Sequence, residues 1–327
     1  MIRCGEVLSL TLLIVITPAY RRDETCSPIP LERLMEKRTV FSARFLPYAL
    51  LAPQLAVTLI FFYWPAGQAV YQSFQLQDAF GMSSEFVWFD NYLLLFKDPT
   101  YFAAMGVTAI FSIVVTVLSL SIAMLLAVHA DRNLRGSGIY KTLLIWPYAV
   151  APVVAGALWL LMLQPSLGIL AKVLRTTGYD WNPALHSNDA LILVIAAAVW
   201  KQISYNFLFC LAGLQAIPKS LIEAAAIDGA SPSRRFWTII FPLLSPTAFY
   251  LLTVNIVYVF FDTFGIINTV THGGPAGATT TLVYKVFNDG VGGGDLGSSA
   301  AESVILMLIV IVLTGAQFRF LERKVNY

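Results

Sequence analysis

Six long apolar stretches limit what this chain can fold into more than any other feature of its sequence. No Asp, Glu, Lys or Arg occurs between Arg44 and Asp78, between Tyr101 and Val128, or between Thr142 and Ala171. Three more apolar stretches cover about 190–214, 246–270 and 299–318. Each can supply the roughly 20 residues that a helix needs to cross the hydrocarbon core. Because only 12% of the 327 residues are charged, against about 25% in soluble domains, the sequence predicts an all-α polytopic membrane protein with six transmembrane helices.

The connections between these stretches differ in their content of Lys and Arg. One set contains thirteen basic residues: Arg33, Lys37, Arg38, Arg44, Arg132, Arg135, Lys141, Lys219, Arg234, Arg235, Arg319, Arg323 and Lys324. The other set contains four: Lys97, Lys172, Arg175 and Lys285. Because cytoplasmic connections carry the excess of Lys and Arg, we expect both termini and the 215–246 loop in the cytoplasm. The outer connections are rich in aromatic residues, which favours interfacial anchoring over a docking surface.

The 215–246 loop has the composition of an ordered structure. A short helix is expected over Leu221–Ile227, since the segment consists of good helix formers and Gly229 is placed to end it. Ser231 and Pro232 have the types preferred at an N-cap and first helical position, which predicts a second short helix. The loop could lie on the membrane surface or be gripped by another protein.

The residues of this loop match a known pattern. Glu223-Ala224-Ala225 is followed after three residues by Gly229, and nine residues later by Ile239-Ile240-Phe241-Pro242. This spacing resembles the EAA signature of ABC importer permeases, with Phe241 where Leu is usual. The resemblance implies that the loop docks into a cytoplasmic ATPase. The residues that it assigns to coupling are Glu223, Ala224, Ala225, Asp228, Gly229 and Pro242.

Two ionisable residues, Lys201 and Asp262, stand out within the apolar stretches, where charge is costly unless it faces a cavity or a partner. Other polar residues accompany them in the same two stretches: Gln202, Tyr205, Asn206 and Asn255. These six residues could line a translocation path. They could equally join the helices through a Lys201–Asp262 ion pair or inter-helix hydrogen bonds. The sequence leaves both hypotheses open.

Several further segments extend the resemblance to most of the chain. They include FLPYALLAPQL at 45–55, WKQISYNFLF at 200–209, NIVYVFFDTF at 255–264 and GGPAGATTTLVYK at 273–285. From about Arg44 to Tyr327 the chain resembles the A-type permease branch of bacterial sn-glycerol-3-phosphate ABC importers, and the GGP-x-x-x-TTT feature is similar to binding-protein-dependent carbohydrate permeases more broadly.

The resemblance implies a type I ABC importer permease (MetI-like) fold in the inner membrane. It also implies a second homologous permease, two copies of an ABC ATPase and a periplasmic solute-binding protein as partners. The solute would be sn-glycerol-3-phosphate or a glycerophosphodiester. A permease for a neutral sugar or oligosaccharide is the alternative.

Motifs for other kinds of chemistry do not occur in the sequence. It has no G-x-x-x-x-G-K-[ST] loop to bind ATP phosphates, so ATP hydrolysis is expected in a partner and the chain is not expected to be an enzyme. The cysteines Cys4, Cys26 and Cys210 lack metal-ligand spacing, and we expect no metal and no cofactor. A membrane enzyme would need a reactive cluster and an ion channel a filter motif, and neither occurs.

Residues 1–34 differ in composition from the rest of the chain. The apolar run from Val7 to Ile16 imitates a secretory signal but is too short to span a bilayer. A cleaved signal, a peripheral extension and a start assigned too early are the alternatives, and a true start at Met35 is preferred. The transmembrane domain is therefore expected to occupy 35–327.

Small and ring-containing residues predict local features within the spans. Gly106, Gly156 and Gly213 are expected to allow close packing of helices. Pro53, Pro65, Pro147 and Pro152 are expected to kink or break the spans that contain them, the last two within the third span.

Overall fold

The computed structural model describes residues 46–77, 83–131 and 136–321. The extension expected at 1–34 and the start expected at Met35 lie outside these residues. The chain divides into two compact units, 1–59 and 60–327. The first unit contributes helix α1 (Leu46–Thr58), in which Pro53 is an interior residue, and a π-helical turn, η3 (Leu59–Tyr63), begins at the boundary. The remaining elements belong to the second unit.

The second unit is built almost entirely of helices. The long ones are α4 (Pro99–Ala130), α8 (Ser187–Ala216), α11 (Phe241–Val257) and α14 (Leu296–Leu321). The shorter ones are α2 (Trp64–Gln72), α3 (Asp90–Leu95), α5 (Ser137–Ile145), α6 (Pro152–Leu163), α7 (Ile169–Thr176), α9 (Lys219–Ile227), α10 (Pro232–Arg235), α12 (Phe264–Val270) and α13 (Leu282–Phe287). Tighter or wider turns join some of them: the 3-10 turn η4 (Trp146–Ala149) and the π-helical turns η5 (Phe236–Ile240), η6 (Tyr258–Asp262) and η7 (Asn288–Gly292). One antiparallel hairpin pairs β1 (Gln75–Gln77) with β2 (Ser84–Phe86), with Leu76 opposite Glu85.

In the described part of the chain, five helices are long and apolar enough to cross a membrane: Leu46–Gln72, Pro99–Ala130, Ser187–Ala216, Pro232–Asp262 and Leu296–Arg319. A bent pair, Gly138–Ala149 with Pro152–Leu163, makes a sixth if it is counted as one span. The helical membrane fold is therefore confirmed. The predicted count of six transmembrane spans holds if the bent pair is one span.

The third span is broken, as its two prolines predicted. The helix axis bends by 108° between its two halves, Gly138–Ala149 and Pro152–Leu163. Pro147 lies in the 3-10 turn η4, and Ala151, directly before Pro152, has an extended backbone with φ −61° and ψ 144°. A residue before proline is driven out of the helical region by the proline ring, so the helix cannot continue. A single uninterrupted helix over Thr142–Ala171 would be the wrong description.

The fifth span begins earlier than the sequence indicated. It runs from Pro232 to Asp262, and Pro246 is an interior residue of α11 rather than its start. The π-helical turn η5 directly before α11 lets the chain pass Pro242, which occupies the first turn of that helix. The expected end at Val270 belongs to a separate helix, α12, after the turn η6.

Helices α4 and α8 form the most extensive helix pair of the second unit. Alanines lie at the buried contact surfaces of both helices, including Ala123 and Ala127 in α4 and Ala197 and Ala198 in α8, and all four have 0% exposure. Because lipid is as apolar as a leucine side chain, helices in a membrane associate by close packing of small residues rather than by the hydrophobic effect. Larger side chains, such as the buried Phe207, fill the space beside these contacts.

Two of the three glycines allow close packing. A Cβ atom on Gly213 would lie 2.6 Å from Leu244 Cδ1, and one on Gly156 would lie 3.0 Å from Val270 Cγ2. The expectation for Gly106 was wrong, since nothing lies within 4 Å of its Cβ position.

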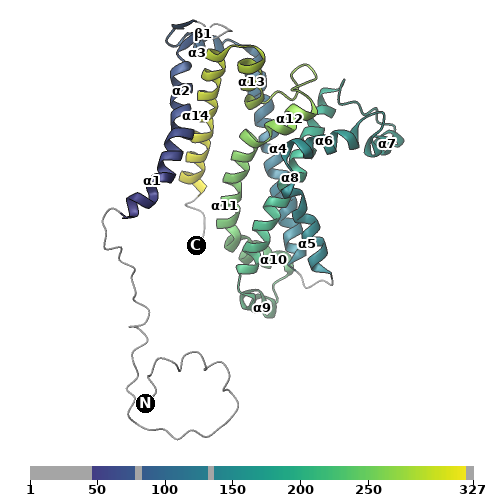
Figure 1. Ribbon diagram of the computed structural model, residues 1–327. Helices are drawn as coiled ribbons and strands as arrows, with labels where there is room; N and C mark the ends of the chain where they lie inside the picture. The colour runs from purple at the N-terminus through teal and green to yellow at the C-terminus, as the bar shows by residue number, and fades with distance from the viewer. Residues whose placement is uncertain (1–45, 78–82, 132–135, 322–327) are drawn as a thin grey trace, which may run out of the picture. The chain divides into compact units, whose positions relative to one another are not determined.

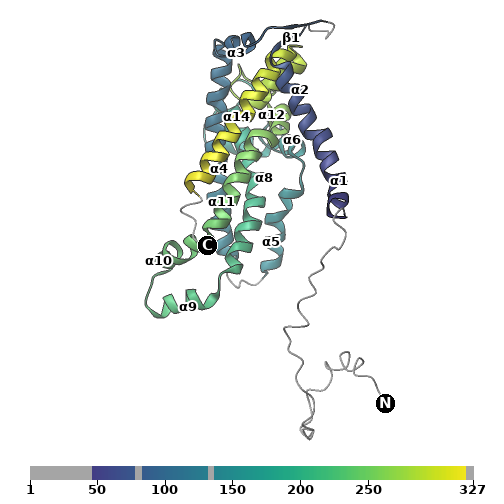
Figure 2. The ribbon, with the colours of Figure 1, turned by 90° about the vertical axis from the view of Figure 1, so that its left-hand side faces the viewer.

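The connections of the second unit gather at two opposite ends of its long helices. In both ribbon views, α9 and α10 lie at one end of α8 and α11, whereas β1 and α3 lie at the other (Figures 1 and 2). Figure 1 also shows α13 at the end that carries β1 and α3. This separation agrees with the two sets of connections distinguished by their Lys and Arg content.

Aromatic residues of the connections that the sequence assigned to the outer side differ in their surroundings. Trp88 is 67% exposed, as an interfacial anchor would be. Trp181 is 3% exposed and its indole N–H donates a hydrogen bond to the Leu163 carbonyl at 2.8 Å. Interfacial anchoring was therefore wrong for Trp181, whose ring packs in the core.

Candidate functional site

The expected helix of the 215–246 loop is present as α9, and Gly229 ends it. Gly229 has φ +82°, a conformation that glycine adopts without steric cost. Its N–H donates to the Ala226 carbonyl at 3.1 Å, and the N–H of Ala230 donates to the Ala225 carbonyl at 3.0 Å. These two bonds form a Schellman motif, which satisfies carbonyl groups that the end of a helix leaves free.

The second helix of the loop begins as the sequence indicated. The hydroxyl of Ser231 accepts a hydrogen bond from the N–H of Arg234 at 3.4 Å, and Pro232 occupies the first turn of α10. The cap and the Schellman turn together fix the angle between α9 and α10. Pro242 lies further along, in the first turn of α11.

The motif residues of α9 face away from the bundle. Glu223, Ala224 and Asp228 are exposed, and the neighbouring Ile227 is 87% exposed. Within the described residues, neither carboxylate forms an ion pair. Ile222, on the opposite side of the helix, packs against the core. The loop thus presents two free carboxylates and an apolar side chain on a rigid helix.

Two of the six polar span residues form a buried network between helices. The Nδ2 of Asn255 donates to Oδ1 of Asn206 at 2.8 Å, and Nδ2 of Asn206 donates back to Oδ1 of Asn255 at 3.2 Å. The Ser119 hydroxyl donates to the same Oδ1 of Asn255 at 3.1 Å. All three side chains are fully buried. The network joins α4, α8 and α11, and Gln202 is also buried at 4% exposure.

The other three residues lie at the surface of the second unit. Asp262 is exposed, while Lys201 and Tyr205 are half-buried. In the described residues Lys201 forms no ion pair with Asp262; its Nζ lies 5.9 Å from the ring centre of Tyr148. The hydroxyl of Tyr205 lies 2.9 Å from that of Tyr250. Among the described residues of this unit, Asp262 is thus exposed and Lys201 and Tyr205 are partly exposed.

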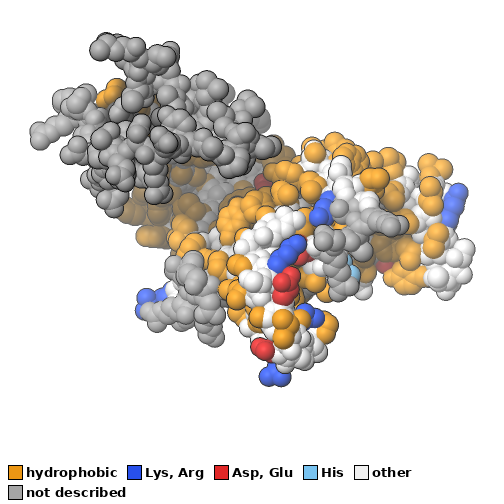
Figure 3. Space-filling view, turned by 90° about the horizontal axis from the view of Figure 1, so that it is seen from below, with side chains coloured by type: hydrophobic (Ala, Val, Ile, Leu, Met, Phe, Trp, Pro, Cys, Tyr) orange, Lys and Arg blue, Asp and Glu red, His pale blue; other side chains and the backbone are white. Residues whose placement is uncertain are grey.

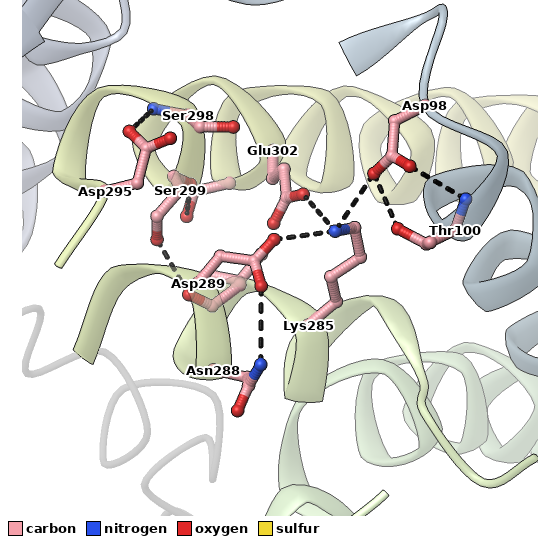
Figure 4. Close-up of polar contacts among 11 residues, drawn as sticks. Asp98, Thr100, Lys285, Asn288, Asp289, Asp295, Ser298, Ser299 and Glu302 are labelled. Atoms are coloured by element: carbon pink, nitrogen blue, oxygen red, sulfur yellow. Dashed lines mark hydrogen bonds and ion pairs between the residues drawn. The ribbon is translucent and has the colours of Figure 1, made fainter. Parts of the chain in front are cut away.

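A charged cluster at the end of the bundle that carries β1, α3 and α13 was not predicted from the sequence. Nζ of Lys285 lies 2.6 Å from Asp289 Oδ2, 3.2 Å from Asp98 Oδ2 and 3.3 Å from Glu302 Oε1 (Figure 4). The Glu302 side chain is 1% exposed. The sequence analysis singled out two ionisable residues within the apolar stretches. Glu302 is a third, near the start of the last stretch, and its position there could have indicated a buried charged cluster.

The environment of this cluster changes the pKa of Lys285 and that of Asp98. Burial favours a lower pKa for Lys285, but its hydrogen bond to Asp289 and the nearby charge of Glu302 outweigh burial and raise the pKa above its usual value. Burial also favours a higher pKa for Asp98, and here hydrogen bonds from the Thr100 hydroxyl and N–H outweigh it and lower the pKa. Both groups are therefore held in their charged forms.

The glycine and threonine pattern before α13 has a structural explanation. The hydroxyl of Thr280 donates to the Gly273 carbonyl at 3.0 Å, and that of Thr279 donates to the Gly274 carbonyl at 2.9 Å. Gly273 has φ +77°, and a Cβ atom there would lie 2.6 Å from the Tyr284 ring. The threonines thus hold the loop closed over α13, which carries Lys285.

Comparison with known proteins identifies the class. Residues 102–327 match the model of the family described as "Binding-protein-dependent transport system inner membrane component". The chain belongs to this family. It is a membrane permease component of an ABC transporter and not itself an enzyme.

The chain matches curated relatives over nearly their whole length. The sn-glycerol-3-phosphate transport system permease protein UgpA of Brucella suis is 60% identical over 291 residues, 89% of this chain and 99% of the relative. The proteins of the same name from Agrobacterium fabrum and Yersinia pseudotuberculosis are 61% and 57% identical, over 88% and 89% of this chain and 98% and 99% of the relatives.

Two solved structures share the fold. One is a bacterial ABC transporter involved in the import of the acidic polysaccharide alginate, with TM-score 0.74 and 22% identity over 85% of this chain and 96% of that chain. The other is the alginate transporter in complex with its alginate pentasaccharide-bound periplasmic protein, with TM-score 0.75 and 21% identity over 86% and 96% of the two chains. The importer permease fold is therefore confirmed.

Proposed function

We propose that this chain is a permease subunit that translocates sn-glycerol-3-phosphate, or a glycerophosphodiester, across the inner membrane. The observation that carries the proposal is the 57–61% identity to glycerol-3-phosphate permeases over nearly their full length. A second homologous permease, two ATPase copies and a periplasmic solute-binding protein complete the transporter. Both termini and the 215–246 loop lie in the cytoplasm, and residues 35–327 form the transmembrane domain.

Coupling to ATP hydrolysis is assigned to α9 and the turn that follows it. Glu223 and Asp228 are exposed carboxylates without ion-pair partners among the described residues, so a basic cleft on the ATPase can bind them. Ala224 and Ala225 allow close approach of the partner's backbone. Gly229 adopts the positive φ that the Schellman turn requires, and Pro242 occupies the first turn of α11.

The translocation path is assigned to the surface residues Lys201, Tyr205 and Asp262. Lys201 supplies a positive charge for a phosphate group, and Tyr205 supplies a hydroxyl for glycerol oxygens. Gln202, Asn206 and Asn255 support the path from behind by holding the helices that carry these side chains. The path assignment is tested by uptake kinetics. Lys201→Met should raise KM for the phosphorylated solute, and Lys201→Arg should restore it.

Uptake of labelled sn-glycerol-3-phosphate by cells that lack the gene tests the main proposal. The intact chain should restore uptake, whereas Glu223→Lys should reach the membrane and restore none. Glu85→Lys, which reverses an exposed carboxylate at the other end of the bundle, is the control for charge reversal itself. If the intact chain restores uptake of a neutral sugar and not of glycerol-3-phosphate, the solute assignment is wrong.

A further inference from the structure

An apolar groove lies next to α10, the second short helix of the 215–246 loop. It has a volume of about 610 Å³ and is formed by residues of α4, α8, η5 and α11. Its walls are mainly large hydrophobic side chains, among them Leu120, Met124, Trp237, Phe241 and Phe249. No Asp, Glu, Lys or Arg lines it in the part of the chain that the structure describes. Its size falls in the range of small-molecule pockets, about 300–1,000 Å³.

Basic groups lie next to this groove at the end of the bundle that carries α9 and α10. Phe236 lines the groove and also a smaller cavity of about 230 Å³ that contains Arg235. The Nε of Arg235 is buried and has no hydrogen-bond acceptor among the described residues, and Arg234 beside it is exposed. Asp131 shares the smaller cavity. Within the described residues neither arginine forms an ion pair.

The surface at this end combines the two kinds of side chain. Seen from the side of α9 and α10, Lys and Arg side chains lie beside hydrophobic ones (Figure 3). Trp237 is 61% exposed and its ring packs edge-on against Phe236. An exposed tryptophan beside basic residues is typical of the boundary between lipid chains and headgroups.

We propose that this groove binds an anionic phospholipid of the inner leaflet, with an acyl chain against Leu120, Met124 and Phe249 and the phosphate at Arg234 and Arg235. The phosphate would supply the acceptor that the buried Nε of Arg235 lacks, and burial of an unpaired donor is costly. Basic pockets between transmembrane helices on the cytoplasmic side suit anionic headgroups. The leaflet assignment rests on the proposed cytoplasmic position of the 215–246 loop.

The position of the groove links the lipid to transport. The turn η5 forms one wall of the groove and follows α10 directly, and α10 is joined to α9 through Gly229 and Ser231. A lipid in the groove would therefore brace the segment that transmits motion from the ATPase. Transport in anionic membranes should be faster than in purely zwitterionic ones.

Native mass spectrometry of the purified, delipidated transporter complex tests the proposal. Phosphatidylglycerol and phosphatidylcholine with identical acyl chains are added separately, and bound lipids are counted. Phosphatidylglycerol should bind more tightly. Arg234→Gln with Arg235→Gln should weaken its binding roughly 30-fold, at about fivefold for each basic residue near an anionic headgroup. Ala248→Trp, which fills the groove, should abolish the preference.

Matched variants separate the site from general effects. Lys141→Gln removes a basic residue that lines neither the groove nor the smaller cavity beside it. Ala109→Trp fills a second apolar groove of about 510 Å³, which shares no lining residue with the cavity that contains Arg235. Both should keep the preference for phosphatidylglycerol. The proposal is refuted if the two lipids bind equally, or if the arginine pair and Lys141→Gln behave alike. It is also refuted if Ala248→Trp releases the second permease instead of lipid, since a protein helix would then fill the groove.

Discussion

Removal of Lys285 should destabilise the protein far more than removal of its buried partner Glu302. The ammonium group of Lys285 lies within 4.0 Å of three carboxylates, from Asp98, Asp289 and Glu302. In Lys285→Met, Glu302 loses the one cation that pairs with it in the described structure while its side chain is 1% exposed. In Glu302→Gln, Lys285 keeps two carboxylates. The two variants are therefore not symmetrical.

The size of the effect follows from the burial of Glu302. Breaking a buried ion pair by removal of one partner costs about 3–5 kcal/mol, because an uncompensated charge remains in the interior. Lys285→Met should cost up to that amount, because protonation of Glu302 removes the uncompensated charge and limits the loss. Glu302→Gln should cost about 0–1 kcal/mol, because Lys285 keeps its pairs with the partly exposed Asp98 and Asp289. The double variant should be more stable than Lys285→Met alone, since no buried charge is left without a partner.

Denaturation in detergent micelles, followed by tryptophan fluorescence, measures these free energies of unfolding. The four proteins form a double-mutant cycle, which isolates the interaction between the two residues. Lys97→Met, at a basic position near the same end of the bundle, controls for loss of a surface cation. A loss below about 1 kcal/mol in Lys285→Met, or additive losses in the double variant, would refute the assignment of Glu302 as a buried, lysine-dependent carboxylate.

Three other outcomes follow from the packing and charges of the second unit. Asn255→Leu leaves Asn206 buried without its main partner and should cost about 1–3 kcal/mol, seen as a lower unfolding temperature; an unchanged temperature would count against the network. Gly213→Leu should cost about 1–3 kcal/mol by overpacking against α11, while Gly106→Leu, with nothing within 4 Å, should be nearly neutral, and equal losses would contradict the packing. The lowered pKa of Asp98 means that its stabilising contribution is present above the ordinary value of 3.8 and is lost as the pH falls through the folded value. Asp98→Asn should therefore flatten the acid limb of a stability profile measured from pH 6 to 3.

Local signals in the sequence predicted the loop well. Gly229, Ser231 and Pro232 act through the backbone of their own neighbourhood, so their residue types alone indicate a helix end and a helix start. The break in the third span was predicted for the same reason, since proline restricts the residue before it wherever it occurs. Such features require no knowledge of the tertiary fold.

Features that depend on partners distant in sequence were less predictable. Asn206 and Asn255 were identified as polar residues in spans, but their mutual hydrogen bonds and burial depend on how α8 and α11 pack. The cluster around Lys285 brings together residues from positions 98 to 302, and only Glu302 carried a signal of its own. Gly106 shows that residue type alone does not predict a helix contact, because a glycine in a span need not lie against another helix.

The three surface residues of the polar set constrain how this chain exists in the membrane. A charged group at the centre of a bilayer costs about 2.5–3.5 kcal/mol on insertion scales. Lys201 and Asp262 do not form an ion pair with each other within the described residues. Their attraction over a longer distance offsets only part of that cost. Facing lipid, both side chains would be unfavourable. The face that carries them therefore needs water or a second protein against it, as in a permease whose path forms at the contact between two subunits.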